Sequence, residues 1–254
     1  MRVEQLLSTT AARLGHKPAI VAGRASHSYA DLDRKSDRLA AAMTARGIGP
    51  GDRVAVFLDH GCATVVATFA VLKAGAVLCP VAPGRREADL ADILVRSRVV
   101  GVVTGARLAS VTAAALAQIG GIKFVVLVGG DRSASQGSCL SYEDVVSGIG
   151  PAAMASIGSG ADPAIVLHGI GPDGQPACET FTHRDLTTAV SVAAVREDAT
   201  VIAARPISSQ YGLYQMLAAV KVGATQVLVS PFAARAPLLG LGADNREVRL
   251  ALAG

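Results

Sequence analysis

The chain has 254 residues, of which 51% are hydrophobic, 4% aromatic and 17% charged, with four cysteines and no tryptophan. These values exclude a disordered chain, a collagen and a disulfide scaffold, and the length suffices to bury one large or two small hydrophobic cores. Basic residues exceed acidic ones by 24 to 20, with no run of five like charges, so we expect no nucleic-acid partner. The cysteines lack CxxC spacing, which predicts reduced thiols in a cytoplasmic protein and no metal site.

The N-terminal residues, Met1 to Gly15, do not have the pattern of a signal peptide, because Arg2, Glu4 and Arg13 interrupt the apolar run. The most apolar stretch, Gly61 to Gly84, carries Lys73 near its centre. A lysine there would cost about 2.5 to 3.5 kcal/mol in a bilayer. We therefore expect a buried helix and strand and no membrane span.

Asp31 to Arg46 predicts an amphipathic helix, with Ser28 as its N-cap and Gly47 as its stop. Beyond it, segments of strand and helix length alternate along the chain, which predicts right-handed crossovers and a mostly parallel sheet. The expected strands are Arg53 to Leu58, Ala76 to Val81, Val99 to Thr104 and Lys123 to Val128, and the expected helices are Ala63 to Leu72, Arg85 to Arg96 and Leu108 to Ile119.

A Gly- and Ser-rich segment, 148–161, predicts a linker between a first α/β unit, 1–147, and a second, 162–232, followed by an unassigned tail, 233–254. The second unit is expected to contain strands Ala164 to Leu167, Thr200 to Ala204 and Thr225 to Ser230 and helices His183 to Arg196 and Tyr211 to Val220. Each unit has a Lys-x-Gly helix end, at Lys73 and Lys221. Internal duplication and ordinary helix-stop chemistry both account for this echo.

The glycine-rich segment Gly169 to Pro176 follows a predicted strand and precedes a predicted helix, a position that suits phosphate binding. It contains no Lys, Ser or Thr, and Pro172 has no N–H to donate. Asp173 would repel a phosphate 4 Å away by about 1 kcal/mol in water and about 4 kcal/mol at partial burial. On spacing alone, a surface turn is favoured.

Five segments resemble the N-terminal part of the adenylate-forming superfamily, which includes acyl-CoA synthetases, peptide-synthetase adenylation domains and luciferases. They are Ser28 to Leu32, Gly47 to Val54, Phe69 to Pro83 (FAVLKAGAVLCPVAP), Asp162 to Leu186 and Pro206 to Gly212 (PISSQYG). The resemblance covers about His16 to Phe232. It implies an α/β fold of mostly parallel sheets flanked by helices, in two related subunits.

The resemblance places cofactor-binding positions at Gly169, Gly171, Gly174 and Thr182, and an acyl pocket at Ser209, Tyr211 and Gly212. The superfamily's phosphate loop reads T-S-G-T-T-G-x-P-K-G, whereas Gly169 to Cys178 lacks its hydroxyls and has Ala177 in place of its lysine. Ser209 stands where the superfamily has histidine. After Phe232 the chain matches none of the superfamily's later segments, including its Y-G-x-T-E adenine segment and its adenylation lysine.

We therefore expect a shortened, degenerate homologue without catalytic residues or a cofactor, a pseudoenzyme that binds a protein partner or an acyl-type ligand. A homodimer is the preferred way to cover its apolar surface. Two alternatives stay open: half of a split ligase, completed by a second chain and using ATP and Mg²⁺, or a relic without selected function. His183 is interpreted as a packing residue at a helix start, and Cys178, five residues before it, as an inert thiol.

Overall fold

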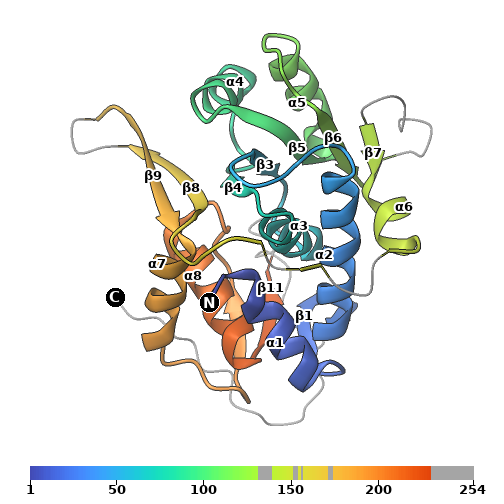
Figure 1. Cartoon of the computed structure of the whole chain (residues 1–254), viewed down its shortest axis with the longest axis vertical. Coiled ribbons are helices and arrows are strands. Elements are labelled where there is room, and N and C mark those ends of the chain that lie inside the picture. Colours follow the sequence, from blue (N-terminus) through green and yellow to red (C-terminus); the bar gives the residue numbers. More distant parts are fainter. Residues whose placement is uncertain (131–138, 151–153, 156, 171–173, 230–254) are drawn as a thin grey trace.

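The computed structural model describes residues 1–130, 139–150, 154–155, 157–170 and 174–229 (Figure 1). Its α-helices are α1 (Glu4–Leu14), α2 (Tyr29–Thr44), α3 (Cys62–Lys73), α4 (Glu87–Arg96), α5 (Ala109–Leu116), α6 (Tyr142–Ser147), α7 (His183–Ala189) and α8 (Gln210–Val222). Its strands are β1 (Pro18–Ala22), β2 (Ala25–Ser28), β3 (Arg53–Phe57), β4 (Val77–Pro80), β5 (Val99–Gly105), β6 (Phe124–Val128), β7 (Cys139–Ser141), β8 (Pro163–Ile170), β9 (Pro176–Thr182), β10 (Thr200–Ala203) and β11 (Thr225–Leu228). Short 3-10 helices η1 (Ala106–Leu108) and η3 (Val190–Val192) precede α5 and follow α7.

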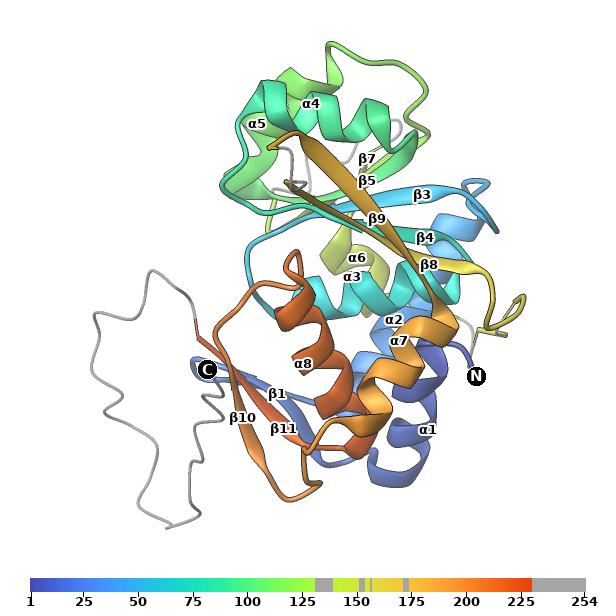
Figure 2. The same cartoon turned by 90° about the vertical axis from the view of Figure 1, so that its left-hand side faces the viewer.

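The strands form two sheets that are mostly parallel, as the sequence predicts. The larger has the order β7-β6-β5-β3-β4-β8-β9, and only the β8–β9 pair in it is antiparallel. The smaller has the order β10-β11-β1-β2, with β1 and β2 antiparallel. Figure 2 shows α4 and α5 on one face of the larger sheet and α2, α3 and α8 between the two sheets. The α/β fold class is confirmed.

The two sheets do not follow the predicted division of the chain. Strands β8 and β9 come after the predicted linker, 148–161, yet they extend the sheet built by the first unit. Conversely, β1 and β2 come from the N-terminal residues and complete the smaller sheet, where Ile20 of β1 lies opposite Gln226 of β11. The reason is that a strand pairs with whichever sheet edge its neighbours expose, and sequence order alone does not show this.

Helix α2 begins at the N-cap that the sequence predicts, Ser28. The Ser28 hydroxyl accepts from the Asp31 N–H at 3.2 Å, and Asp31 accepts in return from the Ser28 N–H at 3.2 Å, a capping box. Gly47, with a φ of +77°, follows the helix in the left-handed region. Helix α7 is shorter than the predicted His183 to Arg196, because it gives way to a 3-10 turn at Val190.

Both Lys-x-Gly segments end a helix, and the glycines Gly75 and Gly223 have φ values of +77° and +88°. The two lysines differ in their surroundings. Lys73 is buried and its Nζ contacts the carboxylates of Asp33 and Asp37 on α2, whereas the Lys221 Nζ lies 3.5 Å from the Val190 carbonyl. Lys73 therefore joins α3 to α2 in addition to ending its own helix.

The apolar stretch Gly61 to Gly84 forms α3 and β4, the buried helix and strand that the sequence predicts. Among the described residues, no helix has both the length and the apolar character needed to cross a membrane.

Candidate functional site

The glycine-rich segment lies between two strands of an antiparallel hairpin, β8 and β9, which projects at one side of the molecule in Figure 1. Gly169 of β8 pairs with Ala177 of β9. Gly174 is exposed with a φ of +77°, and an added Cβ there would meet nothing within 4 Å. Gly171, Pro172 and Asp173 lie outside the described residues.

Helix α7 begins at His183, as the sequence predicts, but a strand that the sequence did not predict, β9, lies between it and the glycine-rich segment. The N–H groups at the start of a helix therefore do not lie next to the segment, and its anion-binding potential loses the contribution that a helix N-terminus makes. Sequence reasoning missed β9 since its residues, Pro176 to Thr180, are exposed and show no buried alternation.

Thr182, a predicted cofactor-binding position, is the N-cap of α7. Its hydroxyl accepts from the Asp185 N–H at 3.1 Å and donates to the Asp185 carboxylate at 2.7 Å, while its own N–H donates to the same carboxylate at 2.8 Å. This capping box occupies the hydroxyl. The structure thus gives Thr182 a structural role.

The predicted acyl-pocket residues gather at the start of α8. The Ser209 hydroxyl caps the helix, accepting from the Gly212 N–H at 3.2 Å and donating to the Pro206 carbonyl at 2.8 Å. A Cβ on buried Gly212 would lie 2.3 Å from that carbonyl, so the tight turn requires glycine. Tyr211 is exposed, with the Arg205 guanidinium carbon 5.4 Å from its ring centre. The three residues are brought together, but Tyr211 faces solvent.

A recess with a free volume of only about 10 Å³, roughly the space of one water, lies beside this turn, and sequence reasoning did not identify it. It sits at the carboxyl end of β3, where the chain crosses first to β4 and then to β5 on the opposite side, the place where open α/β sheets bind ligands. The His60 Nε2 lies 2.7 Å from the Ala203 carbonyl of β10. Its lining is Val56, Leu58, His60, Thr64, Val81, Pro83, Pro206, Ile207 and Ser208. The recess is therefore too small to hold a substrate group, and the His60 Nε2 that lines it already contacts the Ala203 carbonyl.

Among the described residues, side chains that could act as nucleophiles or metal ligands do not cluster. Burial raises the pKa of Cys79 to about 12 and that of Cys62 to about 11, so both thiols stay protonated near neutrality. Cys178 is exposed on β9, whereas His183 is buried, and no hydrogen bond joins them. Within the described ranges, no group of three or more His, Cys, Asp or Glu side chains could hold a metal ion.

Comparison with known proteins identifies relatives of this fold. The family model described as AMP-binding enzyme matches residues 7–244, a range that includes part of the tail for which we found no resembling segment. Salicyl-AMP ligase / salicyl-S-ArCP synthetase of Mycobacterium tuberculosis is 32% identical over 168 residues, which are 64% of this chain and 29% of that protein. Isonitrile lipopeptide synthase of the same organism is 30% identical over 187 residues, 73% of this chain and 6% of that protein.

Solved structures agree with this relationship. The apo structure of Mycobacterium smegmatis MbtA superposes with a TM-score of 0.79 at 30% identity, covering 89% of this chain and 43% of that one. The anthranilate CoA ligase AuaEII in complex with anthranoyl-AMP gives a TM-score of 0.82 at 16% identity, which supports the fold alone. This chain spans less than half the length of each of these relatives.

Proposed function

The chain belongs to the AMP-binding enzyme family, and we propose that within it this chain is a degenerate homologue that forms no acyl adenylate by itself and acts by binding. The observation that carries the proposal is the chemistry of the β8–β9 hairpin. Between Gly169 and Thr182 the sequence has no Lys or Arg, and the Thr182 hydroxyl is held in the α7 capping box.

The charges near this hairpin support the proposal that it does not bind a triphosphate. Acyl adenylation depends on donors and cations that stabilise the charge on the transferring phosphate. Here, the exposed residues of β9 contribute the Glu179 carboxylate, and the sequence adds Asp173. Each carboxylate within 4 Å of a phosphate opposes binding by about 1 kcal/mol in water and about 4 kcal/mol at an effective dielectric of 20. The N-terminus of α7 follows β9 at His183, at the end of the hairpin away from Gly174 and Pro176, so it does not offset the charge near those residues.

A second copy of the chain is the partner that we propose. The hydrophobic content of 51% supports association, because a second copy would cover apolar surface that one copy leaves exposed. Sedimentation of the purified chain at micromolar concentration tests this part separately. A dimer supports it, and a stable monomer refutes it.

Calorimetric titration with MgATP tests the loss of nucleotide binding. We expect no saturable heat up to millimolar nucleotide. A gain-of-cation variant, Ala177→Lys, places an amine where the superfamily has its lysine, and Ala177→Gln is the matched uncharged control. Weak binding by the lysine variant alone would support the electrostatic argument. Saturable binding by the unmodified chain would overturn it.

The second candidate is half of a split ligase, whose missing groups a second chain supplies. The retained backbone favours it, since the TM-score to MbtA is 0.79 despite the altered hairpin. It requires adenylate formation with ATP, Mg²⁺ and an aromatic or fatty acid when the chain is mixed with a protein carrying the superfamily's adenine segment. Pyrophosphate release from the mixture, and from neither protein alone, would favour this candidate over the first.

A further inference from the structure

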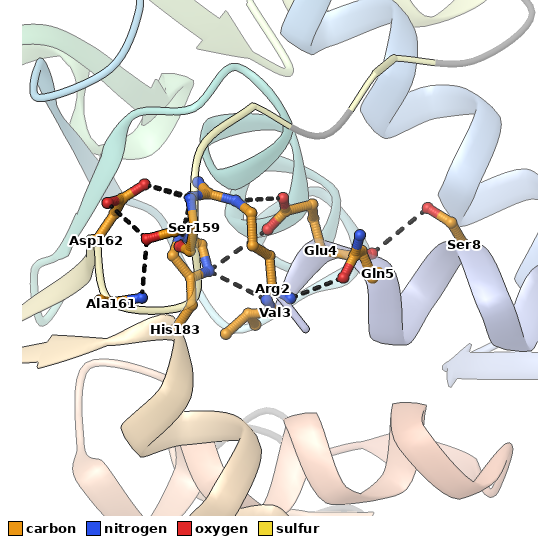
Figure 3. Close-up of polar contacts among 9 residues, drawn as sticks. All are labelled: Arg2, Val3, Glu4, Gln5, Ser8, Ser159, Ala161, Asp162 and His183. Carbon is orange, nitrogen blue, oxygen red and sulfur yellow. Dashed lines mark hydrogen bonds and ion pairs between the residues drawn. The ribbon is translucent and has the colours of Figure 1, made fainter.

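The first residues of the chain contact the junction between β9 and α7 (Figure 3). The Val3 N–H donates to the Nδ1 of His183 at 3.1 Å. Arg2 donates to the Ser159 carbonyl and to the Asp162 carboxylate, both at 3.0 Å, and to the Glu4 carboxylate at 2.8 Å. The backbone N–H of His183 donates to the backbone carbonyl of Asp162 at 3.1 Å. The N-terminal turn, Arg2 to Glu4, is therefore attached to both ends of the β8–β9 hairpin, close to where β8 begins and where β9 ends.

The contacts require a neutral His183. Its Nδ1 accepts the Val3 N–H, so that nitrogen carries no proton, and the proton of the neutral ring is on Nε2. His183 is fully buried, and its Nε2 has no hydrogen-bond partner within the described structure. Burial lowers the pKa of His183 to about 4, and the nearby Glu4 carboxylate partly opposes this effect.

A proton on Nδ1 would change the contact with the N-terminal turn. Two N–H donors would then face each other where the Val3 hydrogen bond now lies, and the new donor would find the Glu4 carboxylate oxygen 3.5 Å away. The charged groups that face His183 are Glu4, Arg2, Asp162 and the terminal ammonium. Burial penalises the imidazolium more than the Glu4 and Asp162 carboxylates favour it, so a proton on His183 is a poorly compensated buried charge. The Asp162 carboxylate favours the imidazolium less than Glu4 does, because it is 47% exposed and already accepts hydrogen bonds from Arg2 and the Ser159 N–H.

We propose that the N-terminal turn, Arg2 to Glu4, is an acid-releasable latch on the β9–α7 junction, closed while His183 is neutral and opened when it gains a proton. The latch contacts the start of β8 and the end of β9, which are the ends of this hairpin away from the glycine-rich segment. Its opening frees the N-terminus and the start of α7 while leaving the sheet intact. This inference does not depend on whether the chain binds nucleotide.

Two-dimensional amide NMR between pH 7 and pH 3.5 tests the latch. We expect the Val3 amide signal to move with the same midpoint as the His183 ring, well below 6.5, and its exchange protection, corrected for the intrinsic pH dependence, to fall roughly five- to tenfold. His183→Asn should abolish this response, because asparagine accepts a hydrogen bond without titrating. His16→Asn, on an exposed histidine, is the matched control and should leave the midpoint unchanged.

Glu4→Gln gives a second test that does not remove the histidine. Loss of the carboxylate should lower the midpoint, because it removes the charge that favours the imidazolium. A Val3 amide that stays equally protected after His183 has titrated would overturn the proposal. So would a midpoint that Glu4→Gln leaves unchanged.

Discussion

Replacing Lys73 by methionine should destabilise the fold by about 3 to 5 kcal/mol, the usual loss when one partner of a buried ion pair is removed. The Lys73 Nζ lies 2.6 Å from the Asp33 carboxylate, 2.8 Å from the Asp37 carboxylate and 3.0 Å from the Asp33 carbonyl. The Lys73 side chain is 2% exposed and that of Asp37 3%, whereas Asp33 retains 22%. Methionine keeps the apolar stem, so the loss falls mainly on the Asp37 carboxylate.

The loss should depend on pH with a definite sign. Burial raises the pKa of Asp37, and Lys73 opposes that rise. Without the lysine the folded-state pKa increases further above the unfolded value, so the folded protein takes up a proton more readily than the unfolded chain. The difference in unfolding free energy between the variant and the unmodified chain is therefore largest above the raised pKa and shrinks as the pH falls through it.

Urea unfolding at pH 7 and at pH 5 measures this difference. Lys221→Met is the matched control, since this lysine occupies the same place in the second Lys-x-Gly segment but has only a 3.5 Å contact with the Val190 carbonyl, and its loss should stay below about 1 kcal/mol. The double variant Lys73→Met/Asp37→Leu should recover part of the loss, because it removes the uncompensated charge. Equal losses at Lys73 and Lys221, or a double variant less stable than the sum of both single changes, would refute the reasoning.

Three further substitutions test other parts of the fold by urea unfolding. Gly101→Ala should cost about 1 to 3 kcal/mol of unfolding free energy, because the added Cβ would lie 2.3 Å from the ring of buried Phe124. Gly105→Ala should cost less, because its Cβ would lie 3.4 Å from the Leu58 side chain, and the reverse order would contradict this packing. Thr182→Ala should cost about 0.5 to 2 kcal/mol through loss of the α7 capping box, and Thr182→Ser should retain most of it; equal losses would argue against a capping role. Tyr29→Phe should cost about 1 kcal/mol, because the hydroxyl donates to the Ala224 carbonyl at 2.6 Å in the core; an unchanged midpoint would count against that bond.

Local chemistry explains which parts of the fold were predictable. The parallel strands β3, β4 and β5 have both faces covered, and their sequences are therefore continuous apolar runs, which predicted them as buried strands. The ends of helix α2 were predictable because Ser28 is a typical N-cap residue and Gly47 a typical helix-stop residue. Strand β9 left no such pattern, since its exposed residues owe their conformation to pairing with β8.

The candidate site shows the same limit. The resemblance assigned Thr182 and Ser209 to ligand-binding positions; the structure shows that both hydroxyls cap helices, and their ligand-binding role stays a prediction. A local signal was available at Thr182, because Asp185 stands three residues later at capping-box spacing. The position of His60 could not be predicted from the sequence, because its contact with the Ala203 carbonyl joins segments far apart in the chain.

The parallel pairing of β1 with β11 has a consequence for synthesis on the ribosome. Ile20 leaves the ribosome long before its partner Gln226, by roughly 10 to 40 s at ordinary elongation rates of about 5 to 20 residues per second. During that interval the edge of β1 that later pairs with β11 stays uncovered, and such an edge can pair with other nascent chains. Helix α1 and the long apolar surface of α3 emerge in the same period. A chaperone that shields this edge until β11 arrives would therefore raise the yield of folded protein.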